Sequence, residues 1–519
     1  MPDRGEGVKR GLVSAEEELA AFRALQQTLV DRWMALRDVD SGPRDVVVVP
    51  SLSLEGLHLS TISGITHYEE RMLFTVMLLG HPRAHLVYIT SEPLHPATVD
   101  YFVGLVPGVP VAHVRSRLTL LCTHDASPRT LTEKILERPR LVERIRGAIH
   151  PERAHMTCFT VSHLERSLAV RLGIPLYGVD PELLHHGTKS GSRRVFRRAG
   201  VGMPPGVEDV RTEAEIAEAV ANLWEADPAL GRVVVKHDHG FSGEGNAVLR
   251  LSPLAEVRPG HADHGGRVAR ILEALPHVRL ASEGLRYSDF SQHMKHTGGV
   301  VEAFVEGVEA RSPSGQLRIN PRRELEAMST HDQMLGGPDQ QTYAGCRFPA
   351  DPSYRMAIQK DAMRVGEVLV DEGVMGRIAV DFIAVRRSPE GPWEHYAIEI
   401  NLRMTGTTHP LMLMRMLDGG DYDPSTGLYL TGRGDPRYYI ATDSLTSERY
   451  RGLLVDDLLD IAAVHGLHYR PWADTGVVFH LCGALSQFGK LGITAIGGSP
   501  AEAQRSFDET RRVLDEETA

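Results

Sequence analysis

Two short segments near residues 380 and 400 constrain the fold of this chain more than any other feature. Segments 378–383 (IAVDFI) and 397–403 (AIEINLR) alternate apolar and polar residues. A period of two predicts adjacent strands, with Asp381 on one strand and Glu399 and Asn401 on the other sharing a face. Oxygen ligands of this kind suit Mg²⁺. Arg403 follows on that face and could bind a phosphate oxygen or an oxyanion. A hairpin with a merely solvated polar face is the alternative.

Length, charge and cysteine content limit the class of protein. A chain of 519 residues predicts about three domains. The net charge is −11, whereas a nucleic-acid binder is typically basic overall. The four cysteines show neither pairing nor metal spacing, which fits a reducing compartment. The N-terminus lacks a signal-peptide core, and no run of about 18 apolar residues predicts a membrane span. We therefore expect a cytoplasmic protein without a membrane partner.

The chain divides into three predicted parts. Residues 1–179 alternate strand-like and helix-like segments, which predicts an α/β doubly wound domain. Its expected strands are 46–49, 86–89, 118–121 and 156–159, and its expected helices include 69–79, 96–105 and 131–149. Residues 180–418 carry the glycine-rich and acidic motifs. Residues 419–519 form a C-terminal α+β region, with a helix near 452–466 and a strand at 476–482.

A glycine-rich loop lies between two predicted strands of the second part. Strand 233–236 ends in Lys236, the loop 240–246 (GFSGEGN) follows, and strand 247–251 returns. The backbone N–H groups of such a loop, with Ser242, Gly243 and Gly245, can fold over a polyphosphate. A Walker loop is excluded because it needs a helix and a Lys-Ser/Thr pair after the glycines. A long hairpin loop without a ligand explains the glycines equally well.

Scarce lysines and an acidic strand add to this pattern. Only seven of the 57 basic residues are lysines, so Lys189 and Lys236 are candidates for a role that a guanidinium cannot fill, such as a compact charge on phosphate. Segment 300–309 (VVEAFVEGVE) is an apolar strand with acidic residues before a bend. Such a segment could bind adenine through its backbone and ribose through a carboxylate. The candidate binding residues here are Glu302, Phe304, Val305 and Glu309.

In this order along the chain, these motifs resemble the ATP-grasp superfamily. The order is Lys189, Lys236, the glycine loop, segment 302–309, and then Asp381, Glu399, Asn401 and Arg403. Further stretches are similar to the pheganomycin-type peptide ligases and their relatives: 67–71 (HYEER), 188–191 (TKSG), 329–333 (STHDQ), 345–349 (GCRFP), 407–410 (TTHP), 483–486 (GALS) and 489–492 (GKLG). The resemblance thus covers nearly the whole chain and implies an ATP-grasp fold over the middle part.

The resemblance implies an ATP-dependent carboxylate–amine ligase. A carboxylate attacks the γ-phosphate, and an amine then displaces phosphate from the acyl phosphate to form an amide. The implied metal ligands for two Mg²⁺ ions are Asp381, Glu399 and Asn401, and Lys189 and Lys236 neutralise phosphate charge. Arg403 and Lys236 are the implied catalytic residues. The expected substrates are an amino-acid-like carboxylate and the N-terminal amine of a peptide, in natural-product biosynthesis.

Several alternatives stay open at this point. A phosphotransferase (kinase) or a non-catalytic nucleotide-binding protein could use the same nucleotide residues. Arg322, Arg323 and Arg347 could receive a carboxylate-bearing acceptor or lie on a solvated surface. His331 and Asp332 are expected in a polar loop that gates substrate, and His409 could orient a substrate; the other histidines show no zinc pattern. The sequence does not fix the oligomeric state, and a homo-oligomer is compatible with it.

Overall fold

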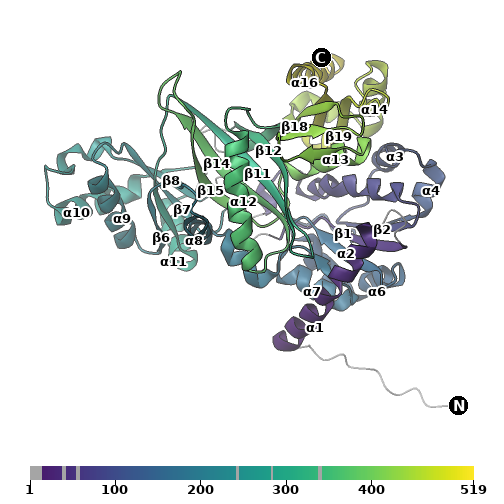
Figure 1. Cartoon of the computed structure of the whole chain (residues 1–519), viewed down its shortest axis with the longest axis horizontal. Coiled ribbons are helices and arrows are strands. Elements are labelled where there is room, and N and C mark those ends of the chain that lie inside the picture. The colour runs from purple at the N-terminus through teal and green to yellow at the C-terminus, as the bar shows by residue number, and fades with distance from the viewer. Residues whose placement is uncertain (1–13, 38–41, 54–58, 241–244, 282–284, 337–341) are drawn as a thin grey trace.

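The described residues form three β-sheets arranged along the long axis of the molecule (Figure 1). The computed structural model describes residues 14–37, 42–53, 59–240, 245–281, 285–336 and 342–519. The N-terminal sheet lies on one side, a tall sheet occupies the centre, and a smaller sheet forms a lobe on the other side. The predicted α/β class is confirmed.

The N-terminal sheet is parallel and covered by helices on both faces, as predicted. Its strands run in the order β3-β2-β1-β4-β5. Val46 and Val48 pack with η2 and α3, whereas Val47 and Val49 pack with α1, α5 and α7. This two-sided burial explains the unbroken apolar run of β1. The elements are α1 (Ala15–Gln27), α2 (Leu29–Arg37), β1 (Arg44–Val49), η1 (Leu59–Thr61), η2 (Ile65–Gly80), β2 (Ala84–Thr90), α3 (Pro96–Gly104), α4 (Val111–Ser116), β3 (Leu118–Cys122), α5 (Leu131–Leu136), α6 (Pro139–Gly147), β4 (Ala154–Cys158), α7 (His163–Leu172) and β5 (Leu176–Tyr177).

Two helix predictions in this part needed correction. The segment expected as one helix over 131–149 is divided into α5 and α6, and Pro139 occupies the first turn of α6. Proline lacks an N–H and clashes with the preceding turn, so it starts a helix more readily than it continues one. The segment at 69–79 belongs to η2, which is a long 3₁₀ helix with residues 69–77 buried.

The smaller lobe contains an antiparallel sheet in the order β6-β10-β7-β8-β9. The predicted hairpin is confirmed, since Lys236 on β7 pairs with Asn246 on β8. Helices α9 and α10 pack on this sheet through Trp224 and Ile271. The elements are η3 (Pro181–Gly187), α8 (Lys189–Ala199), β6 (Gly206–Val210), α9 (Glu213–Ala226), β7 (Arg232–His237), β8 (Asn246–Arg250), η4 (Ser252–Val257), α10 (His264–Ala274), η5 (Leu275–His277), β9 (Arg279–Leu280), α11 (Tyr287–Thr297) and β10 (Gly299–Ala303).

The central sheet has ten strands and continues into the C-terminal region. Its path is β15-β14-β11-β12-β13-β18-β17-β16, and β20 joins β18 to β19. Helix α12 lies across one face (Figure 1). The elements are β11 (Glu309–Ile319), β12 (Leu325–Gly336), β13 (Thr342–Phe348), α12 (Arg355–Asp371), β14 (Gly376–Arg386), β15 (Glu394–Asn401), α13 (Thr408–Asp418), β16 (Asp421–Asp423), β17 (Leu428–Leu430), β18 (Pro436–Thr446), η6 (Glu448–Gly452), α14 (Val455–Val464), β19 (Gly476–His480), η7 (Cys482–Ala484), α15 (Leu485–Phe488), β20 (Lys490–Gly497) and α16 (Pro500–Glu517).

One hydrophobic core joins all three parts of the chain. It contains Leu73 of the N-terminal sheet domain, Phe348 of β13, Leu413 of α13, Tyr439 of β18 and Val478 of β19. The central sheet therefore packs against the N-terminal domain through α13 and the C-terminal strands. None of the described helices combines the length and apolar character needed to cross a membrane.

Candidate active site

Asp381 and Glu399 stand directly opposite each other on the paired strands β14 and β15. The amide of Asn401 donates to one oxygen of Asp381 at 2.9 Å, and the amide of Gln333, on β12, donates to the other at 2.9 Å. The structure thus brings together the three predicted metal-ligand residues at one end of the central sheet. Asp381 and Glu399 are half-buried and Asn401 is buried, so these side chains do not lie on a solvated hairpin face.

Helix α8 brings Lys189 to this group. The helix begins at Lys189 because the Thr188 hydroxyl accepts a hydrogen bond from Gly191 N at 2.9 Å and caps the first turn. Its side packs on β15, where Ser192 Oγ accepts from Ile400 N at 3.0 Å. The Lys189 ammonium then forms an ion pair with Glu399. A lysine and two carboxylates therefore meet at this end of the sheet.

Burial and charge repulsion both act on Asp381. Burial, together with the charge of Glu399, raises the pKa of Asp381 to about 6, although Arg403 and Lys189 oppose the rise. Burial also lowers the pKa of Arg403, against the attraction of Glu399 and Asp381. Two carboxylates this close favour a shared cation, and their hard oxygen donors together with the Asn401 amide fit Mg²⁺.

A second charged group surrounds Lys236 on β7. Its ammonium donates to Glu302 of β10 at 2.7 Å, and the guanidinium of Arg193 donates to the other Glu302 oxygen at 2.7 Å. Glu302 is only 2% exposed. Arg193 lies one helical turn after Lys189 on α8, so this helix links the Lys236 group to the Asp381 group. Because protein cations occupy both Glu302 oxygens, Glu302 is placed to hold Lys236, and its contact with a ribose stays a prediction.

The segment between β10 and β11 connects the smaller sheet to the central sheet. Phe304 N donates to Arg232 O at 3.1 Å, and the Arg232 guanidinium lies 4.0 Å from the centre of the Phe304 ring. Val305 is half-buried. Glu309 opens β11 and accepts hydrogen bonds from Arg311 and Arg386. The adenine-binding role predicted for this segment stays a prediction.

The glycine-rich loop is described only in part. Ser242 and Gly243 lie outside the described residues. Gly245 has a φ of 83°, and its carbonyl accepts from His237 N at 3.1 Å. A Cβ atom at Gly245 would lie 2.8 Å from His237 Nδ1, so this position requires glycine for both its backbone and its space.

The three arginines expected at an acceptor rim lie elsewhere. Ser314 of β11 pairs with Asp381, and Asn320 lies six residues further along the chain. The turn that contains Arg322 and Arg323 is therefore about 20 Å from Asp381, measured along the strand. Arg347 pairs with Asp332, whose carboxylate accepts from Tyr354 OH at the start of α12. Gln333, the residue after Asp332 on β12, faces Asp381. Adjacent residues of a strand face opposite sides, so Asp332 and its partner Arg347 lie on the face away from Asp381. The structure thus places the three arginines away from Asp381, and their role at an acceptor rim stays a prediction.

His331 and Asp332 also differ from their predicted setting. Both lie within β12 rather than in a polar loop. His331 is fully buried, contacts Tyr439 OH at 2.5 Å, and has a pKa lowered to about 3 by burial. Asp332 accepts from Asp351 N at 2.8 Å as well as from Tyr354. The predicted position in a polar loop is therefore wrong, and a role in gating substrate stays a prediction.

The sequence reasoning did not assign roles to three neighbours of the site. Gln333 orients Asp381, Arg193 shares Glu302 with Lys236, and Arg71 approaches Arg403 closely enough to contribute to lowering its pKa. The Arg71 guanidinium lies 4.1 Å from the Phe159 ring centre and comes from the HYEER stretch at 67–71. That stretch was the available signal for Arg71. The other two depend on contacts between distant segments.

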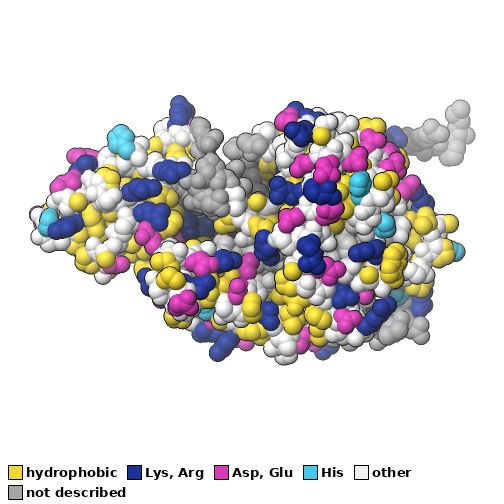
Figure 2. All heavy atoms as spheres, turned by 90° about the horizontal axis from the view of Figure 1, so that it is seen from above, with side chains coloured by type: hydrophobic (Ala, Val, Ile, Leu, Met, Phe, Trp, Pro, Cys, Tyr) yellow, Lys and Arg dark blue, Asp and Glu magenta, His cyan; other side chains and the backbone are white. Residues whose placement is uncertain are grey.

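Lys and Arg side chains gather on one face of the lobe of the β6–β10 sheet, as seen from above in Figure 2. This surface would attract an anionic ligand.

Family models match two stretches of the chain. One, described as IQCH-like, ATP-grasp, matches residues 181–261 and 268–425. The other, described as the PGM1 C-terminal domain, matches residues 457–509. The first match contains Lys189, Lys236, Asp381, Glu399 and Asn401. The lysines and the predicted metal ligands of both charged groups therefore fall within the ATP-grasp match.

Two curated relatives are similar to the chain. An L-propargylglycine–L-glutamate ligase of Streptantibioticus cattleyicolor is 32% identical over 464 residues, which are 88% of this chain and 91% of the relative. The IQ motif-containing protein H of Danio rerio is 25% identical over 78% of this chain, but the match spans only 41% of that longer protein.

The solved structures share the fold at low identity. Biotin carboxylase of Campylobacter jejuni, in complex with β,γ-ATP, has a TM-score of 0.54 at 14% identity and covers 92% of this chain and 95% of its own. The biotin carboxylase domain of the Hydrogenobacter thermophilus 2-oxoglutarate carboxylase, with MgADP and bicarbonate, has a TM-score of 0.52 at 14% identity, covering 89% and 88%. These likenesses support the arrangement of the sheets.

Proposed function

Because the chain belongs to the ATP-grasp carboxylate–amine ligases, we propose that it joins an amino-acid-like carboxylate to the amine of a second amino acid or of a peptide. The 32% identity to a ligase across 91% of that relative establishes the family. That relative is named for L-propargylglycine and L-glutamate, so its substrates are amino acids. The substrates of the present chain, and a role in natural-product biosynthesis, are part of the proposal.

The convergence of Asp381, Glu399, Asn401 and Lys189 supports this proposal most directly. As an ATP-grasp ligase, the chain uses ATP with Mg²⁺, as predicted from the sequence. Asp381, Glu399 and Asn401 would hold Mg²⁺, whose charge would balance that of the phosphates. Lys189 now pairs with Glu399 and would be able to contact phosphate when a metal ion takes over that carboxylate.

The remaining residues would act on the nucleotide and on the reacting carboxylate. Lys236, held by Glu302, would contact phosphate as a point charge. Segment 302–309, including Phe304, Val305 and Glu309, would bind the adenosine part. Gly245, with Ser242 and Gly243, would cover the phosphates and exclude water that could hydrolyse the acyl phosphate.

Arg403 is placed between the metal-ligand residues and the N-terminal domain. It is half-buried, interacts electrostatically with Glu399 and Asp381, and approaches Arg71. In the proposal it stabilises negative charge on the acyl phosphate and on the tetrahedral oxyanion. Arg71, rather than the arginines at 322, 323 and 347, is the second guanidinium near this point.

The proposal is tested by following nucleotide and product together. ADP and phosphate release is measured with ATP, Mg²⁺ and pairs of amino acids or short peptides, and products are identified by mass spectrometry. A ligase yields ADP, free phosphate and a product lighter than its two substrates by one water. The Glu399→Gln variant serves as the control for product that depends on the site.

Each outcome of this panel decides one part of the proposal. A phosphorylated product without free phosphate would identify a phosphotransferase. Amides that form only with free amino acids would exclude the predicted peptide acceptor but would still support the ligase activity. Product formation that does not depend on ATP would overturn the ligase.

A further inference from the structure

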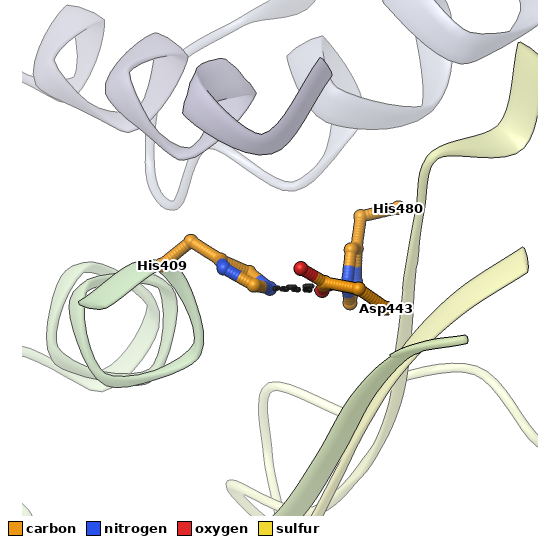
Figure 3. Close-up of side chains that lie close together, drawn as sticks. All are labelled: His409, Asp443 and His480. Atoms are coloured by element: carbon orange, nitrogen blue, oxygen red, sulfur yellow. Dashed lines mark hydrogen bonds and ion pairs between the residues drawn. The ribbon is translucent and has the colours of Figure 1, made fainter. Parts of the chain in front are cut away.

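Three buried side chains outside the proposed active site direct ligand atoms toward one point. His409 lies in the first turn of α13, Asp443 lies on β18, and His480 ends β19 (Figure 3). His409 Nε2 is 3.0 Å from His480 Nε2 and 3.2 Å from Asp443 Oδ1, and His480 Nε2 is 2.9 Å from the same oxygen. Each of the three is at most 5% exposed. The ligand atoms thus form a nearly equilateral triangle.

Hydrogen bonds alone satisfy this triangle poorly. A neutral imidazole carries one N–H, which points along a single direction in the ring plane, yet each Nε2 has two close partners. The Nδ1 atoms of His409 and His480 have no hydrogen-bond partner among the described residues, so both rings make their described polar contacts through Nε2. A cation bound by both Nε2 lone pairs and Oδ1 would satisfy the three converging atoms together.

The size of the triangle fits a transition-metal ion. Bonds of about 2.1 Å from zinc to nitrogen or oxygen place neighbouring ligand atoms about 3.0–3.4 Å apart. The observed edges of 2.9, 3.2 and 3.0 Å are close to this range. We propose that His409, Asp443 and His480 bind one divalent first-row transition-metal ion, with zinc the preferred ion. Three protein ligands leave a further coordination position, which water would fill.

The surroundings support this geometry. Arg71 Nη1 lies 3.4 Å from Asp443 Oδ2, so the guanidinium contacts the carboxylate oxygen that the imidazoles leave available. A partner of this kind orients a metal-binding carboxylate. Gly492 on β20 pairs with His480, and a Cβ atom at position 492 would overlap the His480 ring. The absence of that side chain makes room for the ring to point at the other two residues.

The site differs in chemistry from the group at Asp381. That group offers hard oxygen donors, which suit Mg²⁺, whereas two imidazoles select zinc, copper, nickel or iron. The position also matters, because α13 follows the loop that carries Arg403, and Asp443 and His480 belong to the C-terminal strands. A bound ion would therefore join the C-terminal strands to the segment that follows the active-site residues. The inference does not depend on the identity of the substrates.

Metal content of the full-length chain tests the proposal. The protein is stripped with a chelator, returned to Zn²⁺ in the presence of excess Mg²⁺, dialysed and analysed by elemental mass spectrometry. We expect one equivalent of zinc for the native chain and for His264→Gln. His264 contacts Glu218 and Glu225 on the surface and is the matched control for a histidine beside carboxylates. His480→Gln and Asp443→Asn should lose the zinc.

Two further measurements keep the test decisive if a ligand variant folds poorly. Gly492→Ala retains all three ligands but should displace the His480 ring and lower zinc content. The native chain, loaded with Co²⁺, should show the visible absorption of a site with mixed nitrogen and oxygen ligands, and Zn²⁺ should raise its thermal unfolding temperature. A native chain that takes up no more zinc than His480→Gln, or ligand variants that fold and retain their zinc, would overturn the proposal.

Discussion

The Lys236 ammonium lies 2.7 Å from the buried carboxylate of Glu302, and Arg193 holds the other oxygen of the same carboxylate. Arg193 also pairs with Glu208 at 2.8 Å, so the two cations are held between two carboxylates. Burial would raise the pKa of Glu302, but the charges of Lys236 and Arg193 outweigh this effect and keep the pKa below its usual value. The lysine is therefore held in place before a phosphate arrives, and its side chain loses little freedom on binding.

Replacing Lys236 by alanine should weaken ATP binding and lower turnover together. The loss of one electrostatic contact to the transferred phosphate should cost about 3 kcal/mol of barrier, or roughly a hundredfold in kcat/KM. Lys360→Ala is the matched control, because Lys360 is exposed on α12. Kd for ATP is measured by calorimetry and turnover by ADP release. An unchanged Kd in Lys236→Ala would remove Lys236 from the nucleotide site.

Asp381→Asn and Glu399→Gln should each reduce ADP formation by at least about a hundredfold while the protein stays folded. Asp381 has a raised pKa, so a neutral side chain there removes a buried charge, and stability should be unchanged or higher. Glu394→Gln is the control on the same strand, where Glu394 contacts Arg387 at the surface. Turnover is measured across a Mg²⁺ titration. Near-native turnover in either variant at ordinary Mg²⁺ contradicts the metal assignment.

Gly245→Ala should weaken ATP binding and also destabilise the protein by about 1–2 kcal/mol, because a side chain is strained at positive φ. The new Cβ atom would in addition press on His237, at the base of the β7–β8 hairpin. Gly260 is the matched control, since its φ of 87° is similar but its surroundings are open. Gly260→Ala should lose less stability, because it has the strain of positive φ without the clash, and should leave Kd for ATP unchanged. Equal Kd values for the two variants would show that Gly245 has no part in nucleotide binding.

Acid should destabilise the protein through His331. Burial lowers the pKa of His331 to about 3, whereas a histidine in the unfolded chain has a pKa near 6.5. Below pH 6.5 the unfolded state binds a proton that the folded state does not, so stability falls as the pH falls. Between pH 7 and pH 5 this group should remove about 2 kcal/mol from the free energy of unfolding.

The His331→Gln variant isolates this contribution. Glutamine retains a polar contact for Tyr439 but cannot take up a proton in this range. Urea unfolding at pH 7 and pH 5 should show a loss of stability that is smaller by about 2 kcal/mol in the variant than in the native chain. Equal losses in the two proteins would mean that His331 takes up its proton in the folded state as readily as in the unfolded state.

Local patterns predicted those parts of the site that depend on neighbouring strands. The period of two placed Asp381 opposite Glu399, and the apolar run ending in Lys236 predicted the β7–β8 hairpin, because both pairs are close in sequence. The same reasoning failed for His331. Its strand carries polar residues on both faces, and only packing against Tyr439 and Phe348 shows that one face is core.

Contacts between distant segments could not be predicted in this way. Arg193 reaches Glu302 because α8 packs between two sheets, and no periodicity reports that packing. His409 and His480 are 71 positions apart and meet only because α13 and β19 belong to one core. Pro139, in contrast, was a local signal that helix 131–149 is interrupted, and the helix prediction overlooked it.

The pairing of β13 with β18 has a consequence for how this protein is made. Cys346, Arg347 and Phe348 bond to a strand that lies almost a hundred residues later in the chain. Until that strand has emerged from the ribosome, β13 has an unpaired edge, which is a template for pairing with other chains. A shortened chain that stops at residue 418 would keep the proposed Mg²⁺ ligands Asp381, Glu399 and Asn401 and both lysines but would retain this open edge. Such a fragment should aggregate rather than act as a smaller ligase.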